Sequence, residues 1–276
     1  MDEFANEYFN KITKISTDFT SRRKELAKSR IKMFIGALCR QLIDFKENYD
    51  FLIGSGNSGL FMTKIALMTY ESLNVTAPSV LNLPIYRFKE DGAKLHDNSF
   101  LETYVKEQLK SISSINNILF VDDEIMRGLT AKECFSLILK AFPNINHLDA
   151  TIIAENHFFE WHYKMPKISI SFFAYSPLIQ GLNGNIGYFI PQNLFNGIQK
   201  IIPEIKSYNQ AMAIVINGGI KKIVNNKGEF DLETEKDLKT NLPNYKKTKN
   251  ELLEEIQILV KKSVKEYKEE KIKFRF

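Results

Sequence analysis

Hydrophobic positions along the chain follow two spacings, which predict helices separated by short buried strands. Between Leu26 and Ile43, apolar residues recur at steps of three and four, as they do on one face of a helix. The apolar run from Tyr49 to Ile53 ends in glycine and predicts a buried strand. Residues 60–73, rich in Met, Leu and Ala, predict a second helix.

The same alternation continues through the middle of the chain. Further strands are predicted at 75–88 (with ragged ends at Pro78 and Pro84), 117–121, 148–154 and 168–175, and a further helix at 130–142. Strands separated by helices are typical of a doubly wound, mostly parallel α/β sheet with helices on both faces. In such sheets ligands bind beyond the carboxyl ends of the strands, so we expect the chemistry in the loops that follow them.

Helical extensions are predicted at both ends of this α/β core. We expect an N-terminal helical extension or hood in residues 1–48, the core in residues 49–180, and a C-terminal extension in residues 181–276. Within the last of these, residues 213–230 fit two structures. One is a β-hairpin that turns at residues 217–219, and the other is a helix that continues past them. An apolar stripe near the end of the chain predicts a final amphipathic helix.

Composition narrows the class of protein. The 276 residues are 44% hydrophobic and 26% charged, which excludes collagen, a disulfide scaffold and wholesale disorder. No apolar run is long enough to cross a bilayer, and the N-terminus has no basic and apolar sections of a signal peptide. Cys39 and Cys134 are expected to be free thiols in a reducing compartment. We therefore expect a soluble cytoplasmic protein without a membrane partner.

The net charge of +5 is concentrated toward the C-terminus, in residues 246–276. There lysines alternate with glutamates, which is typical of a solvated helix face and differs from the one-sign cluster that binds nucleic acid. We therefore do not expect a nucleic-acid partner. The terminal helices instead provide surfaces for a homodimer or a partner protein.

Two neighbouring acids, Asp122 and Asp123, follow the buried strand at 117–121. Ionised carboxylates repel each other and lose solvation in an interior, so the pair needs a polyhydroxyl ligand, a metal ion or backbone donors. The loop beyond, residues 124–130, contains a glycine and a threonine and leads into a helix, whose N–H groups and dipole favour an anion. Sugar hydroxyls at the acids and a phosphate at the loop would be neighbours, a geometry that fits a ribose 5-phosphate.

The segment ILFVDDEIMRGLT, residues 118–130, resembles the binding signature of type I phosphoribosyltransferases: an apolar strand, two acids and a short loop that ends in Gly-x-Thr. By order of elements the resemblance covers residues 49–175. It implies that Asp122 and Asp123 hold the ribose hydroxyls. It also implies that the 5-phosphate is cradled by Glu124, Ile125, Met126, Arg127, Gly128, Leu129 and Thr130.

The resemblance assigns two further loops and an acceptor region. The pyrophosphate loop would follow the first strand, at Gly54, Ser55, Gly56, Asn57, Ser58 and Gly59. A mobile catalytic loop would span residues 87–99, with Arg87, Lys89 and Lys94 as the cations that close over the pyrophosphate. Phe158 and Trp161 follow a later strand, where they either stack on an acceptor base or pack in a core.

The activity that the resemblance implies is transfer of ribose 5-phosphate from 5-phosphoribosyl 1-diphosphate (PRPP) to a nitrogenous acceptor, with release of pyrophosphate. Mg²⁺ would bridge the pyrophosphate and the ribose hydroxyls, with Asp122 and Asp123 as hydroxyl or outer-shell partners. The family commonly has small hydroxyl residues where this chain has Met126 and Arg127. This departure leaves open a non-catalytic PRPP- or nucleotide-binding regulatory protein on the same fold.

Two other families share parts of these motifs. Gly54-x-Gly56-x-x-Gly59 matches a dinucleotide-binding fingerprint, but residues 75–86 contain no acid for the ribose of a dinucleotide. Phosphorelay receivers also begin with a strand that reads Val-Asp-Asp-Glu, but they need a phosphoacceptor aspartate on a later strand end. No aspartate occurs between Asp149 and Asp231. Both alternatives therefore lack an essential acid.

Overall fold

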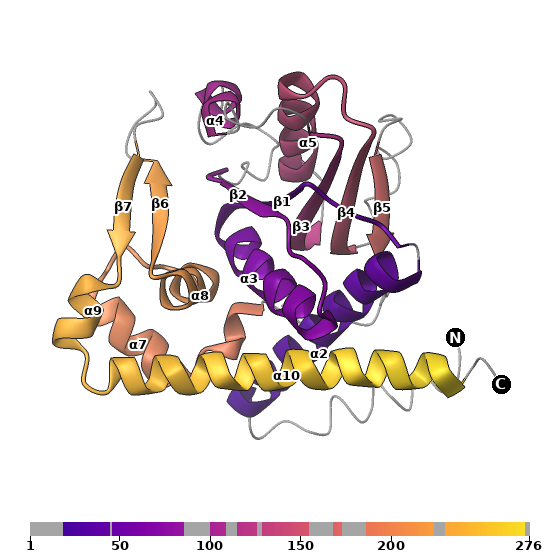
Figure 1. Cartoon of the computed structure of the whole chain (residues 1–276). Coiled ribbons are helices and arrows are strands. Elements are labelled where there is room, and N and C mark those ends of the chain that lie inside the picture. The colour runs from indigo at the N-terminus through magenta and orange to yellow at the C-terminus, as the bar shows by residue number, and fades with distance from the viewer. Residues whose placement is uncertain are drawn as a thin grey trace, which may run out of the picture.

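The structure is a computed structural model that describes residues 19–44, 46–85, 100–108, 115–125, 129–154, 168–172, 186–223 and 230–273. Figure 1 shows a parallel sheet flanked by helices, a separate two-stranded hairpin and a long C-terminal helix. The parallel α/β arrangement expected from the sequence is confirmed.

Five strands form the main sheet in the order β2-β1-β3-β4-β5, and every neighbouring pair is parallel. They are β1 (Phe51–Ser55), β2 (Ser79–Leu83), β3 (Asn117–Ile125), β4 (His147–Ala154) and β5 (Ile168–Phe172). The chain moves from β1 outward to β2 and then crosses back to β3, so the direction of winding reverses between β1 and β3. The carboxyl ends of β1 and β3 therefore flank the topological switch point, where open α/β sheets bind ligands.

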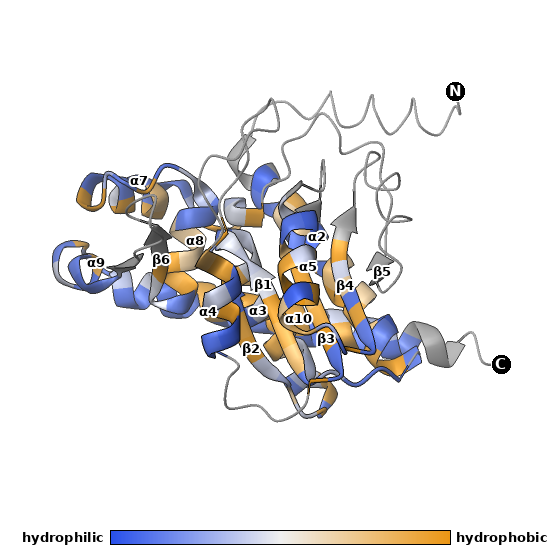
Figure 2. Cartoon of the chain, turned by 90° about the horizontal axis from the view of Figure 1, so that it is seen from above, coloured by the Kyte–Doolittle hydropathy of each residue, from blue (hydrophilic) through white to orange (hydrophobic). Residues whose placement is uncertain are grey.

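Helices cover both faces of the sheet, and successive residues of β3 contribute to opposite faces. Phe120 belongs to the core beneath α4 (Phe100–Gln108) and α5 (Leu129–Ala141), where its ring meets Phe135 edge-on at 4.9 Å. Leu119 and Val121 belong to the core beneath α2 (Phe19–Cys39) and α3 (Gly56–Leu73). In Figure 2 the strands are mainly orange, which matches their burial between the two helical layers.

Helices from the two ends of the chain share the core on the α2–α3 side. A π-helical turn (Arg40–Asp44) prolongs α2, and α10 (Tyr245–Lys273) runs past α2 and α3 (Figure 1). Between β5 and the hairpin lie a 3₁₀ turn (Ile186–Phe189), α7 (Gln192–Ile201) and α8 (Tyr208–Asn217). The buried residues of α10 lie in one cluster with those of α2 and α8. Both predicted amphipathic helices are therefore confirmed.

Residues 213–230 adopt neither of the two structures expected for them. The helix α8 ends at Asn217, and Gly218 takes the left-handed conformation with φ of 78°, which glycine adopts without a steric penalty. The strand β6 (Gly219–Ile223) begins at the next residue and pairs antiparallel with β7 (Phe230–Thr234). Residues 217–219 thus join a helix to a strand, and the hairpin lies downstream of them.

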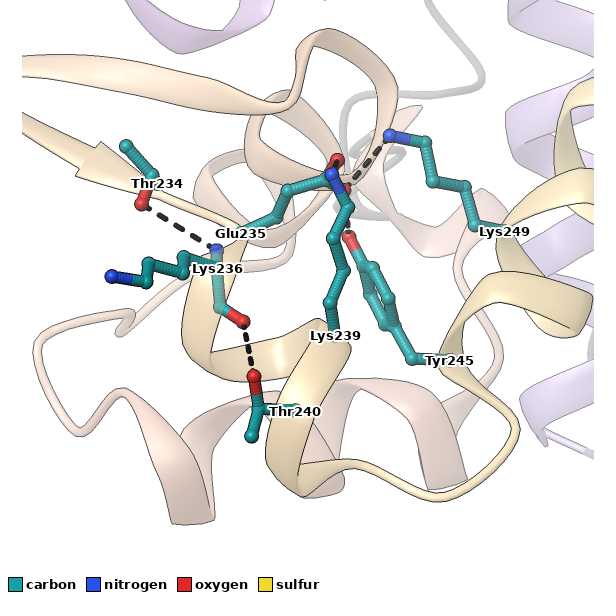
Figure 3. A network of polar contacts seen from close by, with 7 residues as sticks. All are labelled: Thr234, Glu235, Lys236, Lys239, Thr240, Tyr245 and Lys249. Atoms are coloured by element: carbon teal, nitrogen blue, oxygen red, sulfur yellow. Dashed lines mark hydrogen bonds and ion pairs between the residues drawn. The ribbon is translucent and has the colours of Figure 1, made fainter.

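A buried carboxylate, Glu235, connects the hairpin to the last two helices (Figure 3). It lies between β7 and α9 (Lys236–Asn241) and accepts a hydrogen bond of 2.6 Å from the Tyr245 hydroxyl. Its carboxylate also pairs with Lys249 at 2.8 Å and with Lys239 at 2.5 Å. Burial opposes ionisation of Glu235, but the hydrogen bonds from these three residues outweigh it and hold its pKa below the usual range. The network attaches the hairpin to α10.

Two expectations concern the chain as a whole. The division of the chain into three regions at residues 48 and 180 stays a prediction, although α2 from the first region contacts β4 and β5 of the sheet. A partner protein on the terminal helices also stays a prediction. Within the described ranges, no helix combines the length and the apolar character that crossing a membrane would require.

Candidate functional site

The candidate site lies at the carboxyl ends of β1 and β3, where the glycine turn and the acid pair meet. The strand β1 ends at Ser55, α3 begins at the next residue, and β3 carries both acids. The Ser55 hydroxyl donates to Oδ2 of Asp122 over 2.6 Å, and the Ser58 hydroxyl donates to Oδ1 over 2.8 Å. The structure thus brings two predicted motifs into direct contact, although more than sixty residues separate them in the sequence.

A β-bulge lies at the acid pair. Between Val121 and Glu124, β3 advances three residues while β4 advances only two, from Thr151 to Ile153. The extra residue interrupts the regular alternation of side chains between the two faces of the sheet. Asp122 and Asp123 are both buried, with 7% and 8% of their surfaces exposed. The prediction placed the two acids at the end of the strand, whereas β3 continues through them to Ile125.

The charge of Asp122 is unfavourable in this position. Burial raises its pKa well above the usual range, and the negative charge of Asp123 raises it further. Hydrogen bonds from Ser55, from Ser58 and from the backbone N–H of Asp123, the last over 2.9 Å, act in the opposite direction. Two carboxylates this close ionise together only when a cation or further donors stabilise them. The pair therefore suits a ligand that brings hydroxyl groups or a divalent cation.

The glycine turn after β1 packs tightly against the first turn of α3. A Cβ on Gly54 would lie 2.5 Å from the carbonyl oxygen of Gly59, and Gly56 has a φ of 55° that favours glycine. Ser55 occupies the N-cap position of α3 and makes no side-chain cap hydrogen bond; its hydroxyl donates to Asp122. The first N–H groups of α3 lack this cap, and together with the helix dipole they can bind an anion.

The structure describes the predicted 5-phosphate loop, residues 124–130, only at its two ends. Glu124 and Ile125 continue β3, α5 begins at Leu129, and Thr130 is half-buried in its first turn. The strand, loop and helix therefore follow in the expected order. Several predicted site residues lie outside the described residues, and their roles stay predictions: Arg87, Lys89, Lys94, Met126, Arg127, Gly128, Phe158 and Trp161.

Cys134, in α5, also contacts this site. Its thiol lies at the Ser55 hydroxyl, and both burial and the negative charge of Asp122 raise its pKa well above the usual range. Reactive cysteines need a stabilised thiolate, so Cys134 is a packing partner of Ser55 and does not act as a nucleophile. The contacts of Ser55 and Ser58 were not predicted, although hydroxyl residues placed among the glycines of a tight turn were a signal for them.

The neighbouring strands exclude the dinucleotide and receiver interpretations on structural grounds. A dinucleotide fold needs an acid at the end of the second strand, and β2 ends at Leu83, which Pro84 and Ile85 follow. In a receiver the acid pair ends the opening strand, whereas here it lies on β3, after β1 and β2. The arrangement in this chain is a glycine turn on one strand and an acid pair on the next strand of the sheet.

The acid pair also fits a hard divalent cation. Among the described residues, no group of three or more His, Cys, Asp and Glu side chains could hold a metal ion by itself. Mg²⁺ in phosphate-binding enzymes is usually held by one or two carboxylates together with water and substrate phosphates. Asp122 and Asp123 match that donor set, and a cation beside them would offset the repulsion that raises the pKa of Asp122.

An open groove of about 530 Å³ lies at the opposite end of α3, between its last turn and α10. Its lining includes Glu71 and Asn74 on one side and Lys261, Lys265 and Lys268 on the other. Because α3 has 18 residues, the groove lies about 27 Å from the glycine turn along the helix axis. We therefore do not include it in the candidate site, which is defined by chemistry and topology.

Comparisons with known proteins assign no family to this chain. No family model, no curated protein and no solved structure matches it. The interpretation of the site therefore depends on its sequence motifs, its place in the sheet and the contacts described above.

Proposed function

We propose that this chain is a Mg²⁺-dependent phosphoribosyltransferase of type I that transfers ribose 5-phosphate from PRPP to a nitrogenous acceptor. One observation carries the proposal. The acid pair of β3 contacts the glycine turn after β1, at the switch point of a parallel sheet ordered β2-β1-β3-β4-β5. PRPP has the matching groups, since it carries a pyrophosphate, a ribose diol and a terminal phosphate.

In this proposal each part of the donor has its own binding element. The pyrophosphate binds at the uncapped first turn of α3, where N–H groups and the helix dipole attract anions. The ribose hydroxyls lie at the acid pair, and the 5-phosphate binds in the loop that precedes α5. These elements are close together because β1 and β3 are adjacent strands, about 4.8 Å apart.

Magnesium, when bound, would neutralise the negative charge that develops on the departing pyrophosphate. The acid pair would hold it through ribose hydroxyls or water. A cation there would offset the repulsion between the buried carboxylates of Asp122 and Asp123. No third acidic ligand is needed, because the substrate itself supplies phosphate oxygens.

The transfer requires no nucleophile from the protein. A nitrogen of the acceptor forms its bond to C1 of the ribose while the bond from C1 to the pyrophosphate breaks, so that the electron pair leaves with the pyrophosphate. Donors fixed at the first turn of α3 stabilise this charge without reorganisation. Arg87, Lys89 and Lys94 would add positive charge, and closure of their loop would exclude the water that otherwise hydrolyses the donor.

Pyrophosphate release tests the proposal. The chain is incubated with PRPP and Mg²⁺ and with each member of a panel of purine, pyrimidine and small-amide acceptors. We expect release with at least one acceptor, and none from the double variant Asp122→Asn/Asp123→Asn. Equal pyrophosphate release from the double variant and the wild type would contradict the proposal. So would a wild-type chain that neither binds PRPP nor releases pyrophosphate.

One observation favours a second candidate, a non-catalytic PRPP- or nucleotide-binding regulatory protein on the same fold. Asp122 already accepts three hydrogen bonds from the chain itself, which leaves less of its carboxylate for a reacting ribose. Met126 and Arg127, in place of small hydroxyl residues, favour the same candidate. Tight PRPP binding without release for any acceptor in the panel would distinguish this protein from the enzyme.

A further inference from the structure

We infer that Ser55 and Ser58 are positioning residues, which hold the turn at residues 54–59 in its binding conformation by fastening it to Asp122. In this view Asp122 acts mainly through the turn, and less through direct contact with the ribose. The inference rests on the proposed function only in naming pyrophosphate as the ligand of the turn. The hydrogen bonds that hold the turn are present in the chain without ligand.

The hydrogen bonds of Asp122 are the first argument. An ionised carboxylate offers about four acceptor positions, and chain donors fill three of those on Asp122. Ser55 donates to Oδ2 at 2.6 Å, while Ser58 at 2.8 Å and the backbone N–H of Asp123 at 2.9 Å donate to Oδ1. The bond from Ser55 is shorter than an ordinary hydroxyl hydrogen bond, and the other two have ordinary lengths. With 7% of its surface exposed, Asp122 has little left for a ligand.

The turn itself is the second argument. Glycines are needed at positions 54, 56 and 59, because of close backbone approach or positive φ, and glycine is the residue that loses most conformational freedom on folding. The N-cap of α3 provides no side-chain hydrogen bond that would fix the start of the helix. Ser55 and Ser58 stand on either side of Gly56, so a single carboxylate from the neighbouring strand holds both ends of the turn.

The same contacts have an opposite interpretation, which makes the inference testable. The two serine hydroxyls could occupy the positions that ribose hydroxyls take, so that ligand binding must displace them. If they hold the turn, then removing Ser58's hydroxyl weakens pyrophosphate binding. If they substitute for the ribose, then removing it strengthens ribose 5-phosphate binding.

Amide hydrogen exchange of the ligand-free protein tests the fastening directly. In Ser58→Ala we expect exchange at Gly59 and Leu60, the first bonded amides of α3, to accelerate by roughly tenfold, as for loss of one hydrogen bond. Asp122→Asn should accelerate the same amides, and Ser58→Thr should restore protection. Ser72→Ala is the matched control, because its hydroxyl bonds the Met68 carbonyl near the other end of the same helix. Unchanged exchange at the first turn, or equal acceleration along all of α3, would overturn the inference.

Calorimetric titration with two separate probes supplies the readout that a general loss of stability would not produce. We expect Ser58→Ala to weaken binding of magnesium pyrophosphate by roughly tenfold while ribose 5-phosphate binding stays unchanged, as loss of one positioning contact implies. Tighter ribose 5-phosphate binding, or unchanged pyrophosphate binding, would overturn the inference. If the wild-type chain binds neither probe, the proposed function fails, and hydrogen exchange still decides whether the turn is fastened.

Discussion

Gly54 and Gly59 lie backbone against backbone at the junction of β1 and α3. A Cβ on Gly54 would lie 2.5 Å from the carbonyl oxygen of Gly59, and a Cβ on Gly59 would lie 2.6 Å from the carbonyl carbon of Gly54. Neither contact leaves space for a side chain, and neither obstacle is a flexible group. The close approach allows α3 to begin directly at the strand end, and the hydroxyl of Ser58 in its first turn bonds Asp122.

Gly54→Ala should therefore destabilise the protein strongly. We expect the free energy of unfolding to fall by about 2 kcal/mol or more, since the added methyl group must displace backbone. Urea denaturation followed by circular dichroism measures the change. Gly197→Ala in α7 is the matched control, because the added methyl group would meet only the flexible Leu242 side chain. There we expect a change within about 1 kcal/mol, because alanine favours the helix. Equal losses in the two variants would contradict the account of the turn.

Glu235→Ala should destabilise the C-terminal part of the chain. The substitution leaves the buried Tyr245 hydroxyl and two lysines without their shared acceptor, which should cost about 2–4 kcal/mol of unfolding free energy. Glu251→Ala is the control, because its pair with Lys247 is exposed and spans 3.9 Å. We expect a loss of no more than about 0.5 kcal/mol there. A similar small loss in Glu235→Ala would show that the network does not hold the hairpin.

Ionisation of Asp149 should lower the free energy of unfolding as the pH rises. Its buried carboxylate accepts a hydrogen bond of 2.7 Å from the Tyr49 hydroxyl, and burial raises its pKa from the ordinary 3.8. The folded state therefore binds this proton more tightly than the unfolded chain does. The resulting loss of stability begins near pH 3.8 and is complete above the folded pKa. An amide in place of this carboxyl cannot ionise, so the stability of Asp149→Asn relative to wild type should increase over this range in pH-dependent denaturation. A difference that stays constant with pH would contradict this prediction.

Neither cysteine should react with a thiol reagent in the folded protein. Cys39 and Cys134 are both fully buried, and burial raises the pKa of Cys39 to about 12 and that of Cys134 well above its usual value. Ellman's reagent at mildly alkaline pH should therefore modify both thiols only after denaturation. Rapid modification of Cys39 in the native protein would show that α2 opens, and rapid modification of Cys134 would show that α5 opens and would argue against its packing on Ser55.

The elements with strong apolar periodicity were predictable from the sequence, and those that depend on distant contacts were not. Asn117–Val121 has only apolar residues after its first position, so the strand and the following helix were predicted within a few residues. The first strand was placed two residues early, because the apolar Tyr49 precedes β1 and bonds Asp149. The short helix α4 was missed, since only Leu101 and Val105 of its side chains are fully buried.

Glycine pairs and long-range polar contacts limited the prediction further. Gly218-Gly219 fits a hairpin turn as well as a helix end, because both use a residue with positive φ. The motifs of the site were visible in the sequence, but the hydrogen bonds that join Ser55 and Ser58 to Asp122 were not. A bulge in β3 likewise leaves no trace in the apolar pattern.

Binding of PRPP in the presence of Mg²⁺, measured by titration calorimetry, tests the central claim most directly. We expect the wild-type chain to bind PRPP and Asp122→Asn/Asp123→Asn to lose that binding while keeping its circular dichroism and cooperative unfolding. Asp149→Asn is the control for a buried carboxylate elsewhere on the sheet, and it should bind PRPP as the wild type does. Unchanged affinity for PRPP in the double variant would contradict the assignment of the acid pair.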